Sequence, residues 1–301
     1  MLYELSLFLI ALAGSAIGGW IDLKTTEIPD IVPASMAGLG LLAHIIHSYL
    51  SGSWTSVYYS VAVGLIFLVF GYILYYTGQW GEADVLLLAA VGVVLPQPLS
   101  FFSTGLLAPF PAVFILNTFI IGGIYSLVYS LILALKNPGV FPAFVNALKA
   151  GPSKKEAAVL GISALAYIFA IRLVAYFLPA SSDLFLLSMS LKAILYNLLV
   201  FIPSLAFIFV FYKFAHAVDT VAFRRKVKVE DLREGDVLAE DAAGLKSKLY
   251  IGLEAKQIEA IRKEKKEVWI KEGVRYGPTF FLAIIATWLW GNVLFLFLRI
   301  I

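Results

Sequence analysis

The residues Gly81-Glu82-Ala83-Asp84 stand directly before an apolar run that covers residues 85–95. Asp84 is therefore an acid at the edge of a segment apolar enough to lie in a membrane. An ionised carboxylate beside hydrocarbon costs about 3 kcal/mol or more, so it is kept where it faces a bundle interior, a partner or a wet cavity. The alternative is a solvated acid that caps the following helix.

A second acid, Asp22, ends the first apolar run of the chain, residues 2–21. Two carboxylates held close together cannot both ionise easily, and such a pair shares one proton. One member can then accept a proton from water while the other donates a proton to a carbonyl oxygen. Our hypothesis is that Asp22 and Asp84 form one active site and that the rest of the chain positions it.

The composition places the chain in a membrane. Of its 301 residues, 61% are hydrophobic and 14% are charged, and the mean hydropathy is +0.90. Soluble domains are far more polar, so we predict a polytopic α-helical membrane protein. The chain contains no cysteine, which excludes disulfides, thiolate metal sites and a cysteine nucleophile.

The hydropathy pattern predicts about eight transmembrane helices, because a span needs about 20 apolar residues. The expected spans are residues 2–21, 31–50, 57–76, 84–102, 112–135, 157–178, 191–212 and 279–300. A small α+β cytoplasmic insert, with a strand near 224–229, a helix near 254–266 and a strand near 267–270, precedes the last span. We therefore expect four regions: a catalytic membrane core, further transmembrane helices, a soluble domain and a final transmembrane helix, at residues 1–135, 136–222, 223–278 and 279–301.

Basic residues in the loops predict the orientation of the chain, since cytoplasmic loops are rich in Lys and Arg. Lys24 follows the first span, and further basic residues follow the fifth and seventh spans. The alternate loops 51–56, 96–111 and 179–190 contain none. We therefore expect a multi-pass protein of the cell membrane with both termini outside, and Asp22 and Asp84 at the same cytoplasmic edge.

Small residues lead along the first span toward its acid. Gly14, Gly18 and Asp22 are spaced by four residues and so share one face of the helix. Glycines on such a face let a neighbouring helix approach closely. We expect the first and fourth spans to pack here, which would bring the two acids together; ordinary helix packing is the simpler interpretation of the glycines.

The turn after Asp22 is short and polar. Pro29 disfavours helical backbone at Ile28, and Asp30 is a suitable N-cap for the second span. Elsewhere, Asn117 is expected to form a hydrogen bond between helices. His44 and His47 lie toward the outer end of their span, so we assign them no chemistry.

These residues carry a resemblance to a known family. Asp22 followed by Ile28-Pro29-Asp30, together with Gly81-Glu82-Ala83-Asp84 at the fourth span, resembles the type IV prepilin peptidases and archaeal preflagellin peptidases, which are GxGD-type aspartyl proteases of the membrane. The family pattern has Ile-Pro-Asn in the first position and Gly-x-Gly-Asp in the second. Asp30 departs from the first, and Ala83 departs from the second in the manner of archaeal members.

The resemblance implies catalytic roles for Asp22 and Asp84 and no cofactor or metal. It also implies a precursor pilin or archaeal flagellin with a basic leader, cut at the cytoplasmic membrane edge, with the lipid bilayer but no nucleic acid as a further partner. Bacterial bifunctional members carry a cysteine-bearing domain and N-methylate their products; a chain without cysteine is expected to cleave without methylation. Residues with a weaker expected role in positioning or binding the substrate are Gly18, Glu27, Asp30, Gly81, Glu82 and Ala83.

Two other classes of function remain open at this point. A proton- or cation-coupled transporter can use intramembrane acids as a relay, although we find no internal repeat of the kind common in transporters. A non-catalytic scaffold of a secretion machine would tolerate Asn in place of either Asp. A presenilin-like protease also uses GxGD, but there the partner aspartate follows Tyr, whereas Trp20-Ile21 precede Asp22 here.

Overall fold

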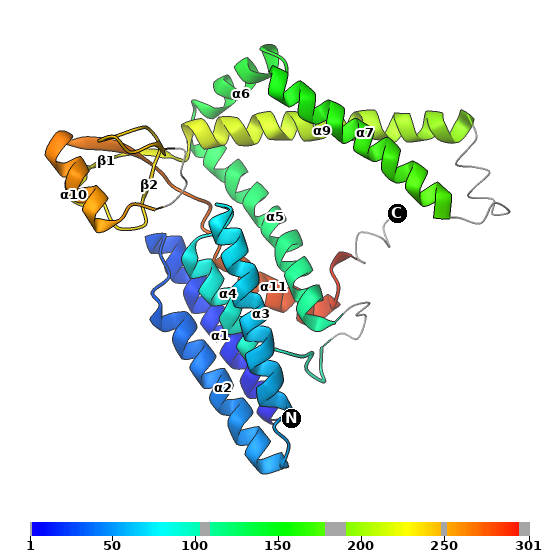
Figure 1. Cartoon of the computed structure of the whole chain (residues 1–301), viewed down its shortest axis with the longest axis vertical. Helices are drawn as coiled ribbons and strands as arrows, with labels where there is room; N and C mark the ends of the chain where they lie inside the picture. The colour runs from blue at the N-terminus through cyan, green and yellow to red at the C-terminus, as the bar shows by residue number, and fades with distance from the viewer. Residues whose placement is uncertain (1, 103–108, 178–190, 248–251, 295–301) are drawn as a thin grey trace. The chain divides into compact units, whose positions relative to one another are not determined.

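A computed structural model of the chain describes residues 2–102, 109–177, 191–247 and 252–294. The described chain is mostly helical, with three short strands late in the sequence (Figure 1). The helices are α1 (Leu2–Thr25), α2 (Ile31–Ser51), α3 (Thr55–Tyr76), α4 (Glu82–Val94), α5 (Phe110–Lys136), α6 (Val140–Lys149), α7 (Lys154–Phe177), α9 (Leu191–Val221), α10 (Ala255–Glu264) and α11 (Pro278–Trp290). The strands are β1 (Arg224–Lys228), β2 (Val237–Leu238) and β3 (Glu267–Lys271), and a 3-10 turn, η1 (Val229–Asp231), follows β1.

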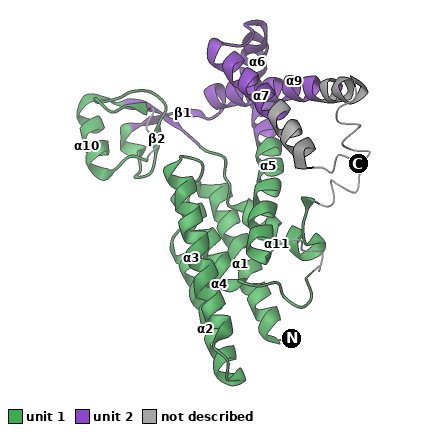
Figure 2. Ribbon diagram, turned by 45° about the vertical axis from the view of Figure 1, so that its right-hand side comes forward, with its two compact units in different colours: residues 1–129, 229–266, 273–301 green, residues 130–228, 267–272 purple. Residues whose placement is uncertain are grey.

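Five segments among the described helices are long and apolar enough to cross a membrane: α1, α2, α3, α5 and Phe201–Val221 within α9. The predicted class, an α-helical polytopic membrane protein with a small α+β segment before the last helix, is confirmed. The chain divides into two compact units (Figure 2). The first comprises Met1–Tyr129, Val229–Lys266 and Gly273–Ile301, and the second comprises Ser130–Lys228 and Glu267–Glu272.

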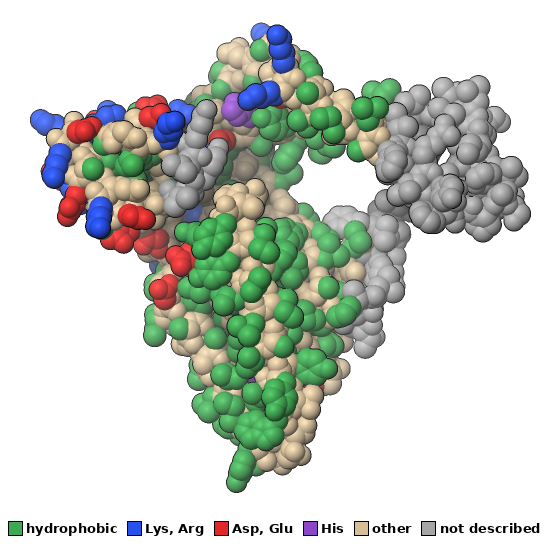
Figure 3. All heavy atoms as spheres, viewed as in Figure 1, with side chains coloured by type: hydrophobic (Ala, Val, Ile, Leu, Met, Phe, Trp, Pro, Cys, Tyr) green, Lys and Arg blue, Asp and Glu red, His purple; other side chains and the backbone are tan. Residues whose placement is uncertain are grey.

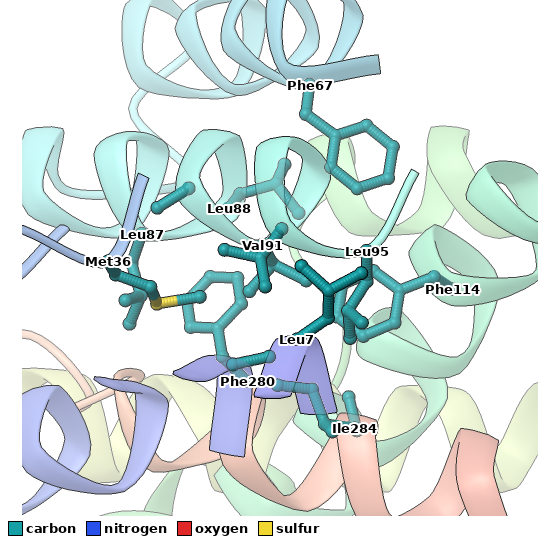
Figure 4. Packing of buried hydrophobic residues seen from close by; sticks show 14 of the residues in the cluster. Leu7, Met36, Phe67, Leu87, Leu88, Val91, Leu95, Phe114, Phe280 and Ile284 are labelled. Carbon is teal, nitrogen blue, oxygen red and sulfur yellow. The ribbon is translucent and has the colours of Figure 1, made fainter. Parts of the chain in front are cut away.

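The first unit is organised around the short helix α4, which packs against α1, α2 and α3. Its side chains Val85, Leu87, Leu88 and Val91 have no exposed surface. Figure 4 shows side chains from α1, α2, α3, α5 and α11 gathered around this helix. A helix that is apolar on every side and buried in this way forms the centre of a bundle.

Glycines on the surrounding helices make room for the valines of α4. A Cβ atom built on Gly40 of α2 would lie 2.6 Å from Val94 Cγ2, and one on Gly64 of α3 would lie 2.4 Å from Val93 Cγ2. Both distances are too short for carbon atoms. In lipid, apolar burial alone gives helices no reason to associate, so such close packing is what holds them together.

The outward faces of α2 and α3 are largely apolar (Figure 3). Exposed large side chains on them include Leu42, Tyr58, Leu65 and Val69. A surface of this kind fits contact with lipid rather than water. Charged side chains gather instead over the small sheet and α10.

In the second unit, α6 packs on α9 through an edge-to-face contact between Phe144 and Phe214, whose ring centroids are 5.6 Å apart. Strands β1 and β3 pair antiparallel, with Arg224 opposite Lys271 and Lys228 opposite Glu267.

Several predicted boundaries need correction. The fourth span, expected over 84–102, is the 13-residue helix α4, which ends at Val94 because Pro96 and Pro98 follow. The seventh span was expected over 191–212. It lies in helix α9, which contains Pro203 and continues to Val221. Helix α6 was not predicted. The loop 179–190 lies outside the described residues, and so does the end of the last span, 295–300.

Candidate active site

Asp22 lies in the last turn of α1 and is only 7% exposed. Its Oδ2 atom accepts a hydrogen bond of 2.7 Å from the backbone N–H of Gly277, which is 255 residues later in the chain. A buried carboxylate needs such a donor, because an unpaired charge in a low-dielectric interior is costly. The start of α11 therefore contributes to the site of the first acid.

Asp84 lies in the first turn of α4, at the third helical position, and is partly buried. Its Oδ2 atom accepts a hydrogen bond of 3.3 Å from the N–H of Gly81, the residue that caps the helix. A carboxylate here also interacts favourably with the helix dipole. The helix-capping alternative is thus part of the observed geometry, although the N-cap itself is Gly81.

The structure brings the two acids to the same end of the bundle. Asp22 and Asp84 lie within electrostatic range of each other. Arg275 lies within range of Asp22, and Tyr276 within range of Asp84. Burial, and then the charge of Asp84, raise the pKa of the Tyr276 phenol, so this group stays neutral and can donate a hydrogen bond.

The glycines of α1 contact three different neighbours. A Cβ on Gly14 would lie 2.6 Å from Met36 Sδ of α2, and one on Gly18 would lie 3.4 Å from Leu87 Cδ2 of α4. Gly18 therefore contributes to the packing of α1 against α4. The tightest backbone contact is made by Gly19, where a Cβ would lie 2.8 Å from Pro278 Cα of α11.

The other predicted positioning residues surround the acids more loosely. Glu27, Asp30 and Glu82 are exposed, while Ala83 is partly buried and packs against the apolar core. Ile28 is non-helical, as Pro29 predicts, and its side chain is buried. Asp30 precedes α2, but its side chain makes no capping hydrogen bond. The predicted side-chain cap is wrong, because the backbone of Asp30 is already helical (φ −55°, ψ −26°).

Three residues near the acids, Arg275, Tyr276 and Gly277, are not among those predicted from the sequence. The guanidinium of Arg275 donates a hydrogen bond through Nη1 to the carbonyl of Leu23, beside Asp22. Tyr276 Oη donates to the carbonyl of Thr118 at 3.1 Å. The available signal was the pair Gly277-Pro278 at the start of the last apolar run, since Pro favours the first helical position.

Several polar atoms of this region are buried without a hydrogen-bond partner in the described part of the chain: Tyr125 Oη, Arg275 Nε and Thr279 Oγ1. Asp22 lies within electrostatic range of Tyr125 as well. Buried polar groups are almost always paired with protein or water. The site therefore has capacity to bind water or the polar backbone of a substrate.

The histidines lie elsewhere, as predicted. His44 is buried and bonds Tyr3 Oη through Nδ1 at 2.6 Å and the carbonyl of Val94 through Nε2 at 3.2 Å. Val94 ends α4, whereas Asp84 lies in its first turn. Within the described residues, no three His, Asp or Glu side chains are grouped so as to hold a metal ion.

Comparison with known proteins gives a family match. Residues 7–127 match the model of the type IV leader peptidase family. The matched segment contains both Asp22 and Asp84 and ends before residues 275–277. No curated protein and no solved structure matches the chain significantly. The match supports the resemblance found on the two aspartate motifs and indicates a protease of the membrane.

Proposed function

We propose that this chain is a membrane aspartyl endopeptidase that removes the short basic leader of prepilin-like or preflagellin-like precursors. Cleavage would take place at the cytoplasmic edge of the membrane and without N-methylation. The observation that carries the proposal is the placement of Asp22 and Asp84, from α1 and α4, within electrostatic range of each other inside the segment that matches the leader peptidase family.

In the proposed reaction the two carboxylates share one proton and hold a water molecule. The ionised carboxylate takes a proton from this water as the water oxygen attacks the scissile carbonyl carbon. The protonated carboxyl gives its proton to the developing oxyanion. Collapse of the tetrahedral intermediate breaks the C–N bond, and the leaving amine takes up a proton from the pair. No metal and no covalent enzyme intermediate is required.

The surroundings of the acids fit a basic leader next to an apolar helix. A substrate helix in the membrane would place its leader junction at the cytoplasmic edge, where we expect both acids to lie. Glu27, Asp30 and Glu82 are exposed on the segments that hold Asp22 and Asp84. We expect them to attract the leader by charge, with Gly18 and Gly81-Glu82-Ala83 shaping the approach to the carboxylates.

This role of the exposed acids is testable. Neutral substitutions such as Glu27→Gln and Glu82→Gln should raise KM for a basic leader at low salt more than they lower kcat, because salt screens such attraction. Steady-state kinetics at two ionic strengths measure the effect. An unchanged KM would contradict the role of these acids in binding the leader.

The test of the function is a cleavage assay with the full chain in detergent or liposomes. The substrate is a pilin-like precursor with a basic leader and an apolar helix, and the variants are Asp22→Asn and Asp84→Asn. Asp231→Asn, which changes an exposed acid of η1, is the matched control. We expect cleavage by the wild type and the control, and none by either active-site variant at equal expression.

Cleavage that persists in Asp22→Asn or Asp84→Asn would exclude the dyad. Failure of the wild type on several precursors would overturn the proposed function. Mass spectrometry of the new N-terminus measures both the cut site and methylation, and a methylated product would contradict the proposed absence of methyl transfer.

A further inference from the structure

The three residues before α11 are Arg275-Tyr276-Gly277, and they contact Asp22 as well as the turn that precedes Asp84. Gly277 donates its N–H to Asp22, and Tyr276 lies against the residues that lead into α4. We propose that this segment, here called the 275–277 segment, is a positioning element that fixes the Asp22 carboxylate relative to Asp84. The inference rests on the proposed function and adds two positioning residues, Gly277 and Tyr276, that lie outside the matched family segment.

Glycine is required at position 277 because a side chain would not fit there, and not because of the backbone conformation. Its φ of −48° is open to any residue. A Cβ at Gly277 would lie 3.0 Å from both Cβ and Oδ2 of Asp22 and 3.2 Å from Cα of Gly19. The absence of a side chain at Gly277 and at Gly19 is what lets the start of α11 approach α1 closely enough for the 2.7 Å hydrogen bond to Asp22.

This hydrogen bond restricts the carboxylate to one orientation. The donor is a backbone N–H at the start of a helix, which cannot rotate away as a side chain can. It engages Oδ2 and leaves Oδ1 of Asp22 without a hydrogen bond from the described residues. One oxygen is thus held by the protein and the other is available to the water that attacks the substrate.

Tyr276 supports the second acid from the neighbouring position. Its ring lies 5.4 Å from the ring of Trp80, which directly precedes Gly81 and the turn that carries Asp84. A Cβ on Gly122 of α5 would lie only 1.8 Å from Tyr276 Oη. The glycine therefore opens a slot for the phenol, whose hydroxyl bonds the carbonyl of Thr118 one turn away.

The 275–277 segment therefore fixes the positions of both acids relative to each other. Adjacent residues of one segment contact Asp22 on one side and the base of α4 on the other. Displacing a reacting group by about 1 Å costs about 100-fold in rate. A change in the 275–277 segment should therefore reduce kcat, while substrate binding along the rest of the site is retained.

The test compares two glycines of the same loop. Gly277→Ala places a methyl group against Asp22, whereas Gly273→Ala adds one where no atom lies within 4 Å. With the full chain in liposomes and a pilin-like precursor, we expect Gly277→Ala to lower kcat about 10- to 100-fold with KM within about twofold. Gly273→Ala should leave both constants unchanged.

Tyr276→Phe and Tyr276→Leu provide the second measurement. Phe keeps the ring against Trp80 and should retain most of kcat, whereas Leu should lose about tenfold. Rescue by Phe is the expected sign of a positioning role for the ring. If Gly277→Ala does not fold, these two variants decide the question.

A readout without turnover separates the inference from the proposed function. A hydrophobic carbodiimide reacts with protonated carboxyl groups, and an N–H bond to the carboxylate opposes that protonation. Asp22 should therefore be modified faster in Gly277→Ala than in Gly273→Ala, as measured by mass spectrometry of the peptide. Equal modification rates together with a wild-type kcat, or an effect on KM alone, would overturn the positioning role even if wild type cleaves and Asp22→Asn does not.

Discussion

The two ends of α11 are both fixed to the bundle by buried polar groups, but in different ways. At its C-terminal end, Asn117 of α5 is fully buried and uses its whole amide. Nδ2 donates to Thr287 Oγ1 at 2.9 Å and to the carbonyl of Gly291 at 2.6 Å, and Oδ1 accepts the N–H of Val293 at 3.0 Å. The hydrogen bond predicted for Asn117 between helices is confirmed.

At its N-terminal end the network is open. Gly277 gives Asp22 one hydrogen bond, while Tyr125 Oη, Arg275 Nε and Thr279 Oγ1 are buried without partners among the described residues. A saturated network stabilises a fold, and a network with spare donors and acceptors can still bind something. From this comparison we expect the junction at Asn117 to be structural and the one at Asp22 to be functional.

The largest expected effect is at the open end. Asp22→Asn should lower kcat by about 1,000-fold, because it removes a group that accepts or donates a proton. The amide oxygen of Asn can still accept the N–H of Gly277, so the melting temperature in detergent should change by no more than about 2 °C. A large loss of thermal stability in Asp22→Asn would show that this end is structural as well.

At the C-terminal end of α11 we expect a substitution to lower stability and to leave activity unchanged. Asn117→Ala leaves the N–H of Val293 and the carbonyl of Gly291 without their partner and should destabilise the bundle by about 2 kcal/mol. Asn146→Ala on α6, whose side chain is exposed, is the matched control. Thermal unfolding measures the stability, and kcat per folded molecule should stay close to that of the wild type. A specific loss of kcat without loss of stability would contradict the division between the two ends.

A smaller effect is expected from the slot that holds Tyr276. Gly122→Ala places a methyl group into the phenol and should lower kcat about tenfold by displacing the 275–277 segment. Gly123→Ala, one residue later in the same helix, meets no atom within 4 Å and should have no effect. Equal activity of the two variants would show that the position of Tyr276 is unimportant for turnover.

The sequence predicts the acids better than it predicts what holds them. Asp22 and Asp84 are recognisable because a carboxylate at the edge of an apolar run is costly and therefore rare. Asn117 is recognisable because a polar amide inside an apolar run is also costly. By contrast, the donor to Asp22 is a backbone N–H at Gly277, and a main-chain group has no sequence pattern of its own.

The contacts between helices are likewise only partly predictable from the sequence. The spacing of Gly14 and Gly18 correctly indicates close contacts of α1, yet Gly19 makes the tightest contact with another backbone, at Pro278 at the start of α11. The length of α4 was overestimated because a run of buried core and a membrane span share the same composition. Only the three-dimensional arrangement shows that α4 is surrounded by other helices.

The smallest effect is expected at the end of the bundle where α1 begins. Tyr3→Phe removes the 2.6 Å hydrogen bond between Tyr3 Oη and His44 Nδ1. Hydrogen bonds between membrane helices contribute about 0.6 kcal/mol on average, so the loss of stability should be of this size, with exposed Tyr59→Phe as control. Because Tyr3 precedes Asp22 by about 28 Å along α1, at 1.5 Å per residue, kcat should not change. A fall in kcat for Tyr3→Phe would mean that strain at this end is transmitted along α1 to Asp22, and that the two ends of the bundle are not independent.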